Sequence, residues 1–200
     1  MHASAPLPVV LVHGIFDRKA KMDAIARRLE RDNRLCHAFD LVPPDGRAHI
    51  LEYARQVGRE VDAILSKTGA DRVDVVGMSM GAVVLRSWIM LLRGWRRTRR
   101  FVSLAGPHHG TATAYLSKLP AAGDLRPGSA LLGRLNSRPV RWNGVGVFTF
   151  WTPFDLMVVP GRSGRLEGAT VDRSFPVLLH PLMAYDRKVL DAVADALTAG

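Results

Sequence analysis

Gly77-Met78-Ser79-Met80-Gly81 is the stretch of sequence that decides the fold. An apolar run at 72–76 precedes it, and a second apolar run at 82–85 follows it. A strand that passes through Gly-x-Ser-x-Gly directly into a helix turns sharply and lifts the serine hydroxyl above the edge of a sheet. Both glycines suit such a turn, because backbone packs against backbone there and a Cβ would collide. A Gly-rich turn after any buried strand could contain the same residues, so the remaining chain has to decide between the two interpretations.

Strands and helices alternate along the whole chain. Continuous apolar runs predict six strands, at 7–12, 37–42, 72–76, 101–105, 145–151 and 169–172. Apolar residues spaced three and four apart predict helices between most of these strands. The alternation is typical of an α/β protein with a mostly parallel sheet of about six strands, right-handed crossovers and helices on both faces.

Length and composition indicate an ordinary globular chain. Its 200 residues are 48% hydrophobic and 23% charged, and we expect one domain over 1–200. Residues 112–140 carry two short helical patterns separated by prolines and glycines. Irregular stretches of this length inside a compact domain are usually functional, so we expect a short lid-like insert there.

Ser79 becomes a nucleophile only if a base and an orienting acid lie nearby. On parallel sheets such sites lie at the carboxyl ends of strands. The histidines downstream are His108, His109 and His180, and the acids before His180 are Asp124, Asp155, Glu167 and Asp172. Asp155 follows a predicted strand closely, and His180 lies between the last strand and the last helix. We therefore predict a triad of Ser79, Asp155 and His180, with Asp172 as the alternative acid.

An acyl-transfer site also needs hydrogen-bond donors for the oxyanion, each worth about 3 kcal/mol. The backbone N–H of Met80 follows the serine at the start of a helix, where the helix dipole assists. A second N–H is expected from the loop after the first strand. That loop is His13-Gly14-Ile15-Phe16, and Ile15 is the candidate.

The formal net charge is +10, and arginines at 93–100 form the densest basic cluster. Basic residues with an aromatic between them can bind nucleic acid. No nucleic-acid motif accompanies this cluster, so we interpret it as a solvated helix end and predict no nucleic-acid partner. The charge is also expected to attract the chain to anionic surfaces, lipid surfaces among them.

Targeting and membrane signals are missing from the sequence. No apolar run reaches the roughly 18–20 residues of a membrane span, and the stretch 1–6 has no basic region followed by a long apolar one. We therefore expect no signal peptide and no transmembrane segment, a cytoplasmic rather than a secreted protein, and a monomer. The single cysteine, Cys36, excludes an intrachain disulfide.

Several motifs together resemble the bacterial lipases and esterases of the α/β-hydrolase fold. The resemblance rests on four segments, at 12–15, 77–81, 105–111 and 125–132, and it spans 8–198. It implies an α/β-hydrolase fold with a minimal lid and a site with the nucleophile Ser79, the acid Asp155, the base His180 and the oxyanion donors Ile15 and Met80. It also implies that Pro107-His108-His109-Gly110-Thr111 borders the acyl pocket.

The chain departs from these lipases in two respects. Met78 stands where many of them have a histidine, and the insert at 112–140 is too short for a full lid. The larger lipases bind calcium or zinc. Here His108 and His109 lack an acidic partner at matching positions, so we predict no metal and no other cofactor.

The sequence therefore predicts a hydrolase of carboxylic esters, a lipase or esterase that cleaves small-molecule or lipid fatty-acyl esters through an acyl-enzyme. The expected pocket residues are Phe16, Met78, His108 and Leu156, although Phe16 and Met78 could equally belong to the core. A thioesterase, an amidase or an acyltransferase would use the same triad. A binding protein without catalysis is the alternative from a different class.

Overall fold

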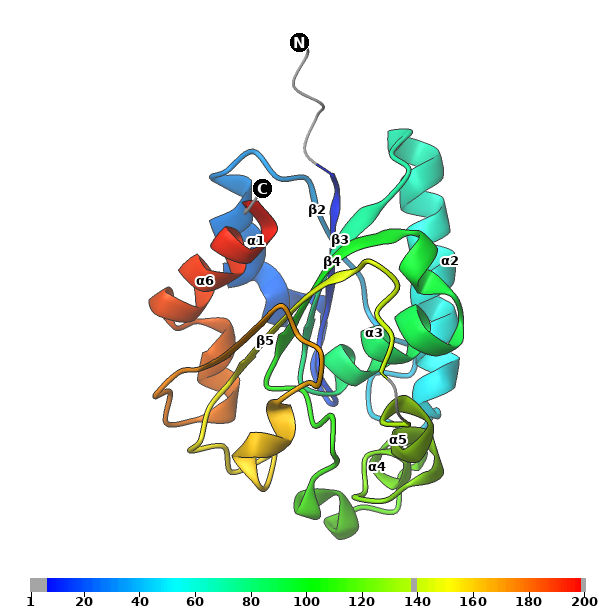
Figure 1. Ribbon diagram of the computed structural model, residues 1–200, viewed down its shortest axis with the longest axis vertical. Coiled ribbons are helices and arrows are strands. Elements are labelled where there is room, and N and C mark those ends of the chain that lie inside the picture. The colour runs from blue at the N-terminus through cyan, green and yellow to red at the C-terminus, as the bar shows by residue number, and fades with distance from the viewer. Residues whose placement is uncertain (1–6, 138–139, 199–200) are drawn as a thin grey trace.

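The sheet has six strands, and every neighbouring pair is parallel. Figure 1 shows the protein as a computed structural model, which describes residues 7–137 and 140–198. The order across the sheet is β2-β1-β3-β4-β5-β6, which confirms the predicted α/β architecture. The strands are β1 (Val9–Val12), β2 (Cys36–Ala38), β3 (Val73–Met78), β4 (Thr98–Leu104), β5 (Gly146–Trp151) and β6 (Val171–Ser174). The stretch at 1–6, where no leader was expected, and residues 138–139 of the insert lie outside the described residues.

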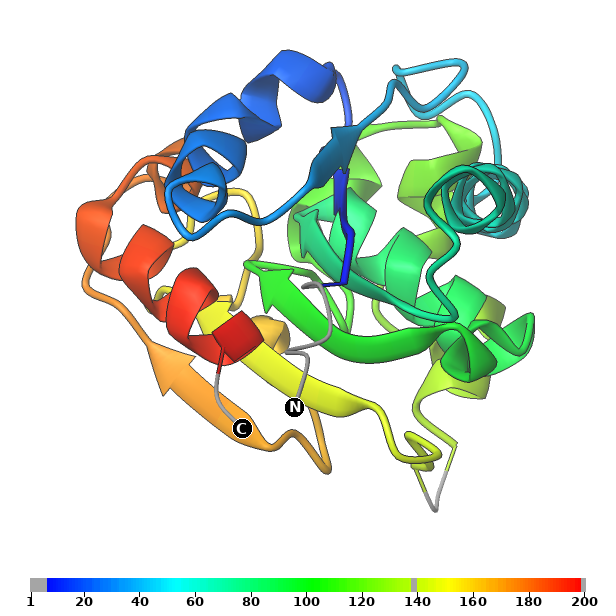
Figure 2. The same cartoon turned by 90° about the horizontal axis from the view of Figure 1, so that it is seen from above.

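Helices cover both faces of the sheet, as Figure 2 shows from above. The helices α1 (Asp23–Glu30) and α6 (Arg187–Thr198) pack together on one face, and α2 (Ile50–Thr68) and α3 (Met80–Leu91) on the other. The insert contributes α4 (Pro120–Asp124) and α5 (Ala130–Leu135). Short 3-10 turns complete the chain: η1 (Lys19–Met22), η2 (Gly94–Arg96), η3 (Ala112–Leu116), η4 (Gly161–Gly164) and η5 (His180–Ala184).

Each face of the sheet has its own hydrophobic core, because side chains along a strand alternate between the faces. On β1, Val10 and Val12 join the core beneath α2 and α3, while Val9 and Leu11 join the core beneath α1 and α6. The central helix α3 is buried nearly all round, which explains why it lacks a polar face. None of the helices in the described ranges is both long enough and apolar enough to span a membrane.

The second strand is shorter than the apolar run at 37–42 predicts. It ends at Ala38, and the chain then leaves the sheet. The N–H of Leu41 donates to the ring nitrogen Nε2 of His13 at 3.0 Å rather than to a neighbouring strand. The side chain of His13, in the loop after β1, therefore takes the place of a strand-to-strand hydrogen bond. It fixes the course of the chain after β2.

The turn between β3 and α3 brings three backbone segments into close contact. A Cβ built on Gly77 would lie 2.7 Å from the Cα of Ala82, and one on Gly81 would lie 2.5 Å from the carbonyl oxygen of Val12. Real Cβ atoms do not approach backbone atoms so closely, so both positions require glycine. Gly81 thus allows the start of α3 to pack directly against the carboxyl end of β1.

Replacing Gly81 by alanine should lower the free energy of unfolding by about 2–3 kcal/mol or more, because the added methyl group meets rigid backbone. Urea unfolding followed by circular dichroism measures this. Gly133→Ala is the matched control, since a Cβ at this position in α5 meets no atom within 4 Å. That variant should gain about 0.5–1 kcal/mol. Equal stabilities of the two variants would contradict the packing described for the turn.

Candidate active site

Ser79 occupies the turn between β3 and α3 with a backbone conformation that is rare for a residue with a side chain. Its φ is 54° and its ψ is −126°, and such strain is typical of functional positions. Its N–H donates to the carbonyl oxygen of Leu104 at 2.8 Å, so the neighbouring strand β4 holds the turn in place. Ser79 lines a cavity of about 200 Å³ at the carboxyl end of the sheet.

Asp155 and His180 form a buried pair in the loops that follow β5 and β6. The ring nitrogen Nδ1 of His180 lies 2.7 Å from Oδ2 of Asp155, and the two residues are 4% and 6% exposed. The other carboxylate oxygen accepts hydrogen bonds from the N–H groups of Met157 and Val158, at 2.9 and 2.8 Å. Because the carboxylate only accepts, Nδ1 carries the proton and Nε2 is left with its lone pair. No described residue bonds to Nε2.

The loop that carries Asp155 and the loop that precedes His180 are tied together. The hydroxyl of Thr152 donates to the carbonyl oxygen of Val177 at 2.6 Å. The same hydroxyl accepts the N–H of Phe154 at 3.2 Å, which turns the chain toward Asp155. Met157 and Val158, which hold the Asp155 carboxylate, also line the cavity at Ser79. Backbone hydrogen bonds therefore connect the cavity wall directly to the acid–histidine pair.

Two N–H groups suited to an oxyanion lie at the same cavity. Ile15 and Met80 both line it, and the N–H of neither donates to any residue within the described ranges. The loop of Ile15 passes against Ser79, since a Cβ on Gly14 would lie 3.1 Å from the Cβ of Ser79. Met80 is the first residue of α3, where the N–H points out of the helix.

His13 fixes the loop of Ile15 and was not singled out by the sequence. It is fully buried, its Nδ1 lies 2.7 Å from the carbonyl oxygen of Gly14, and its Nε2 accepts the N–H of Leu41. Since Nε2 accepts, Nδ1 carries the proton and donates to Gly14. The position of His13, at the start of the expected donor loop, was the signal that could have identified this role.

Of the four expected pocket residues, only Phe16 lines the cavity. Met78 does not, because strand alternation directs its side chain into the core beneath α1 and α6. His108 is completely buried behind the cavity, and Leu156 is 72% exposed and turned away, with Met157 and Val158 in its expected place. The prediction is therefore corrected for Met78, His108 and Leu156. Pro107 and Thr111, from the segment expected to border the acyl pocket, do line the cavity. The sequence missed the other wall residues, which are Ala114, Ala122, Leu125, Met157 and Val158.

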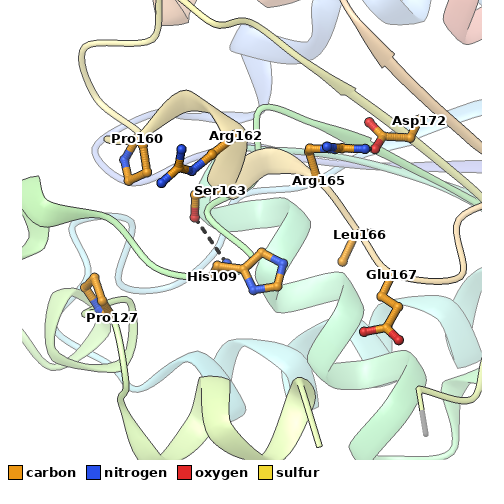
Figure 3. Close-up of a pocket in the computed structure, with 9 residues that line it drawn as sticks. All are labelled: His109, Pro127, Pro160, Arg162, Ser163, Arg165, Leu166, Glu167 and Asp172. Carbon is orange, nitrogen blue, oxygen red and sulfur yellow. Dashed lines mark hydrogen bonds and ion pairs between the residues drawn. The ribbon is translucent and has the colours of Figure 1, made fainter. Parts of the chain in front are cut away.

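A second and larger cavity of about 540 Å³ contains Asp172 rather than Ser79 (Figure 3). Oδ2 of Asp172 accepts a hydrogen bond from Nε of Arg165 at 2.6 Å, and Oδ1 accepts one from the indole of Trp151 at 2.7 Å. In Figure 3, Asp172 and Arg165 lie together at one end, far from Pro127. Asp172 is thus engaged away from His180, and Asp155 is the acid that contacts the histidine.

Two further groups of residues concern this site, the candidate metal ligands and the arginine cluster at 93–100. Within the described ranges, no group of three or more His, Cys, Asp and Glu side chains could hold a metal ion. The basic cluster at 93–100 lies around η2 and the start of β4, at the opposite end of the sheet from Ser79. Two of its members are used by the fold, since Arg97 pairs with Asp62 at 3.0 Å and Arg99 bonds the buried Asp74 at 2.9 Å.

His108 and Arg86 form a buried polar network behind the cavity. Nε2 of His108 lies 2.7 Å from the hydroxyl of Ser103. The carbonyl oxygen of His108 accepts hydrogen bonds from Arg86 on α3 and from Asn136. Complete burial lowers the pKa of His108 well below its ordinary value, and the Arg86 guanidinium lowers it further. Burial also lowers the pKa of Arg86 to about 10. The histidine therefore stays neutral while the cation holds the loop at 107–111 against α3.

The depressed pKa of His108 makes stability depend on pH. The unfolded chain binds a proton at this histidine near pH 6.5, whereas the folded chain does not. Stability that is fully present above pH 6.5 is therefore lost as the pH falls below it, by at most about 1.4 kcal/mol per pH unit. Urea unfolding between pH 7.5 and about pH 5 should show a smaller loss in His108→Gln than in the unaltered chain. Parallel pH profiles of the two chains would contradict a neutral buried His108.

Comparison with known proteins agrees with this geometry. A family model described as palmitoyl protein thioesterase matches residues 8–139, about two thirds of the chain, which include Ile15, Ser79 and Met80 but not Asp155 or His180. No curated protein sequence matches significantly.

Solved structures confirm the α/β-hydrolase fold. The mature Bacillus licheniformis lipase BlEst2 has a TM-score of 0.83 at 16% identity, with 98% of this chain and 94% of that chain covered. Aspergillus fumigatus lipase B also has a TM-score of 0.83, at 15% identity, with 96% of this chain covered. The match covers only 52% of the Aspergillus lipase, so this chain spans about half its length. The product of lin2722 from Listeria innocua has a TM-score of 0.76 at 14% identity, with 98% and 95% covered.

Proposed function

The chain belongs to the palmitoyl protein thioesterase family, and we propose that it hydrolyses fatty-acyl esters through an acyl-enzyme on Ser79. The family and the lipase-like fold support an ester-hydrolase function. One observation carries the finer proposal. The buried His180–Asp155 pair has an Nε2 that no described residue bonds, at the end of the sheet where Ser79 opens into an apolar cavity.

The proposed reaction assigns one role to each group. Nε2 of His180 takes the proton of the Ser79 hydroxyl, whose oxygen attacks the carbonyl carbon of the ester. Asp155 keeps the proton on Nδ1 and stabilises the imidazolium that forms. The N–H groups of Ile15 and Met80 stabilise the oxyanion. His180 then protonates the leaving group, and water, deprotonated by the same histidine, releases the acid from Ser79.

The shape and lining of the cavity support an acyl chain as the bound group. Its wall is mainly apolar, with contributions from Phe16, Pro107, Ala122, Leu125 and Val158. A methylene group takes up roughly as much room as a water molecule in the liquid, about 30 Å³. A cavity of about 200 Å³ therefore holds about six or seven carbons. A longer chain has to continue over the surface beside the cavity.

A thioesterase is the second candidate, because the matched family is one of palmitoyl protein thioesterases. Both reactions would form the same acyl-enzyme on Ser79, and only the leaving atom differs. Comparing kcat/KM for an oxygen ester and a thioester of the same acyl chain and a similar leaving-group pKa separates the two candidates. A large preference for sulfur would favour the thioesterase, and comparable values would favour a general esterase.

Ser79→Ala should abolish hydrolysis of a p-nitrophenyl ester, and Asp155→Asn should lower kcat by about 10²–10⁴-fold, because the histidine loses its orienting charge. Asp172→Asn is the matched control, since this acid binds Arg165 and Trp151 instead of the histidine. It should hydrolyse the ester at the unaltered rate. Steady-state kinetics on the purified chains measure all three variants. Full activity in Ser79→Ala, or equal losses in the two Asp variants, would refute the proposed triad.

Activity should depend on acyl-chain length as the cavity volume requires. Within a series of p-nitrophenyl esters, kcat/KM should rise from acetyl to chains of about six to eight carbons and then level off, as each methylene fills the cavity. Ala122→Val adds two methyl groups to the cavity wall and should move the preference to shorter chains. Highest activity on the acetyl ester in the unaltered chain would show that the cavity does not bind the acyl group.

A further inference from the structure

Large apolar side chains are exposed mainly at one end of the molecule. Of the fourteen that are exposed among the described residues, all but Leu35 and Val171 lie in loops that follow the carboxyl ends of strands. The loops after β1, β4 and β5 line the cavity at Ser79, and the carboxyl ends of the strands point toward the lower part of Figure 1. We call six of these side chains the apolar rim: Phe16, Leu116, Phe154, Leu156, Leu178 and Leu179, each at least half exposed.

The loops of the apolar rim form one connected surface. The hydroxyls of Thr111 and Thr113 both donate to the carbonyl oxygen of Met157, at 2.9 and 2.6 Å, and join the segment that carries Leu116 to the loop after β5. Thr152 joins that loop to the segment that carries Leu178. Monomeric chains rarely expose apolar side chains in such concentration, and a concentration of this kind marks an interaction surface.

The charges beside the apolar rim select its partner. Arg18, Lys19 and Lys118 are exposed on the same loops. The acids on or beside these loops include Asp17, Asp40 and Asp186, all of them only partly exposed. Asp40 and Asp186 already accept backbone N–H groups, from Lys19 at 2.7 Å and from Val189 at 3.1 Å. The rim therefore presents apolar side chains with positive charge around them. A second copy of this chain would bring like charges together. A bilayer with anionic headgroups instead offers an apolar interior for the rim and negative charge for the cations.

We propose that the apolar rim, with Arg18, Lys19 and Lys118, docks the chain on an anionic phospholipid bilayer with the Ser79 cavity facing the lipid. The arginine cluster at 93–100 lies at the other end of the sheet. Docking through that cluster would point the cavity away from the bilayer. The structure thus separates two positive surfaces that sequence alone does not distinguish, and only one of them combines charge with exposed apolar side chains.

Flotation with vesicles of diether lipids tests the docking without any need for hydrolysis, so it is independent of the proposed reaction. Vesicles of pure diether phosphatidylcholine are compared with vesicles that contain about one quarter diether phosphatidylglycerol. Three variants change the net charge equally. Leu116→Asp with Leu178→Asp alters the rim, Leu35→Asp with Val171→Asp alters exposed apolar residues elsewhere, and Arg96→Glu alters the arginine cluster. Circular dichroism and thermal unfolding verify that each variant is folded, and Leu116→Ser with Leu178→Ser replaces the rim variant if it is not.

The unaltered chain should float with the anionic vesicles and bind the neutral ones several-fold less. The rim variant should bind about tenfold or more weakly, while the other two variants stay within about twofold of the unaltered chain. The proposal fails if the unaltered chain does not float or if the rim variant binds like the Leu35→Asp, Val171→Asp control. It also fails if Arg96→Glu causes the main loss, or if sedimentation reveals a dimer that covers the rim and binds no vesicles.

Discussion

The close approach of the β3–α3 turn to the end of β1 is the constraint on which the rest of the structure depends. Gly81 places the first turn of α3 against the carbonyl oxygens of Val12 and His13, and Gly77 lets the helix start directly behind the strand. This contact leaves Ser79 in a strained conformation that only the surrounding backbone can hold. It also brings the loop after β1 against the serine, so that Ile15 and Met80 border the same cavity. One steric requirement therefore sets the position of the nucleophile and of both N–H groups.

The remainder of the site is held by hydrogen bonds rather than by apolar packing. Asp155 accepts from His180 and from two backbone N–H groups, which leaves no carboxylate oxygen without a donor in the buried loop. His13 holds the loop of Ile15 in place in the same way, through hydrogen bonds of both its ring nitrogens. Arg86 is costly to bury, because its guanidinium has no carboxylate partner among the described residues and relies on the carbonyl oxygens of His108 and Leu135. Its burial links α3 both to the loop at 107–111 and to α5 of the insert, so the nucleophile helix and the cavity wall form one unit.

Sequence patterns predicted the sheet and the acid–histidine pair because both follow from local rules. Apolar runs located all six strands, and Asp155 was chosen over Asp172 only by its place after a strand. The pocket was predicted less well, since which residues line a cavity depends on the direction of each side chain. Met78 follows the alternation of β3 into the opposite core, and Leu156 faces outward because the turn after Asp155 directs Met157 and Val158 inward. His108 stands in a motif that borders the cavity, yet its ring bonds Ser103 behind it. The direction of a side chain in an irregular loop cannot be predicted from the periodicity of the sequence.

The size of the Ser79 cavity and the exposed apolar side chains around it both bear on how a long acyl chain would bind. A saturated chain of sixteen carbons needs roughly 480 Å³ at about 30 Å³ per carbon, more than twice the cavity at Ser79. The larger cavity does not supply the missing room, because the hydrogen-bonded segments around Thr111 and Val159 separate it from Ser79. The outer part of a long acyl chain would then lie along exposed side chains such as Phe16, at the mouth of the cavity. That arrangement is costly in water and favourable in the interfacial layer of a bilayer, where the same apolar side chains are covered. A cavity too small for a long acyl chain and an exposed apolar rim beside it would therefore act together in binding such a chain.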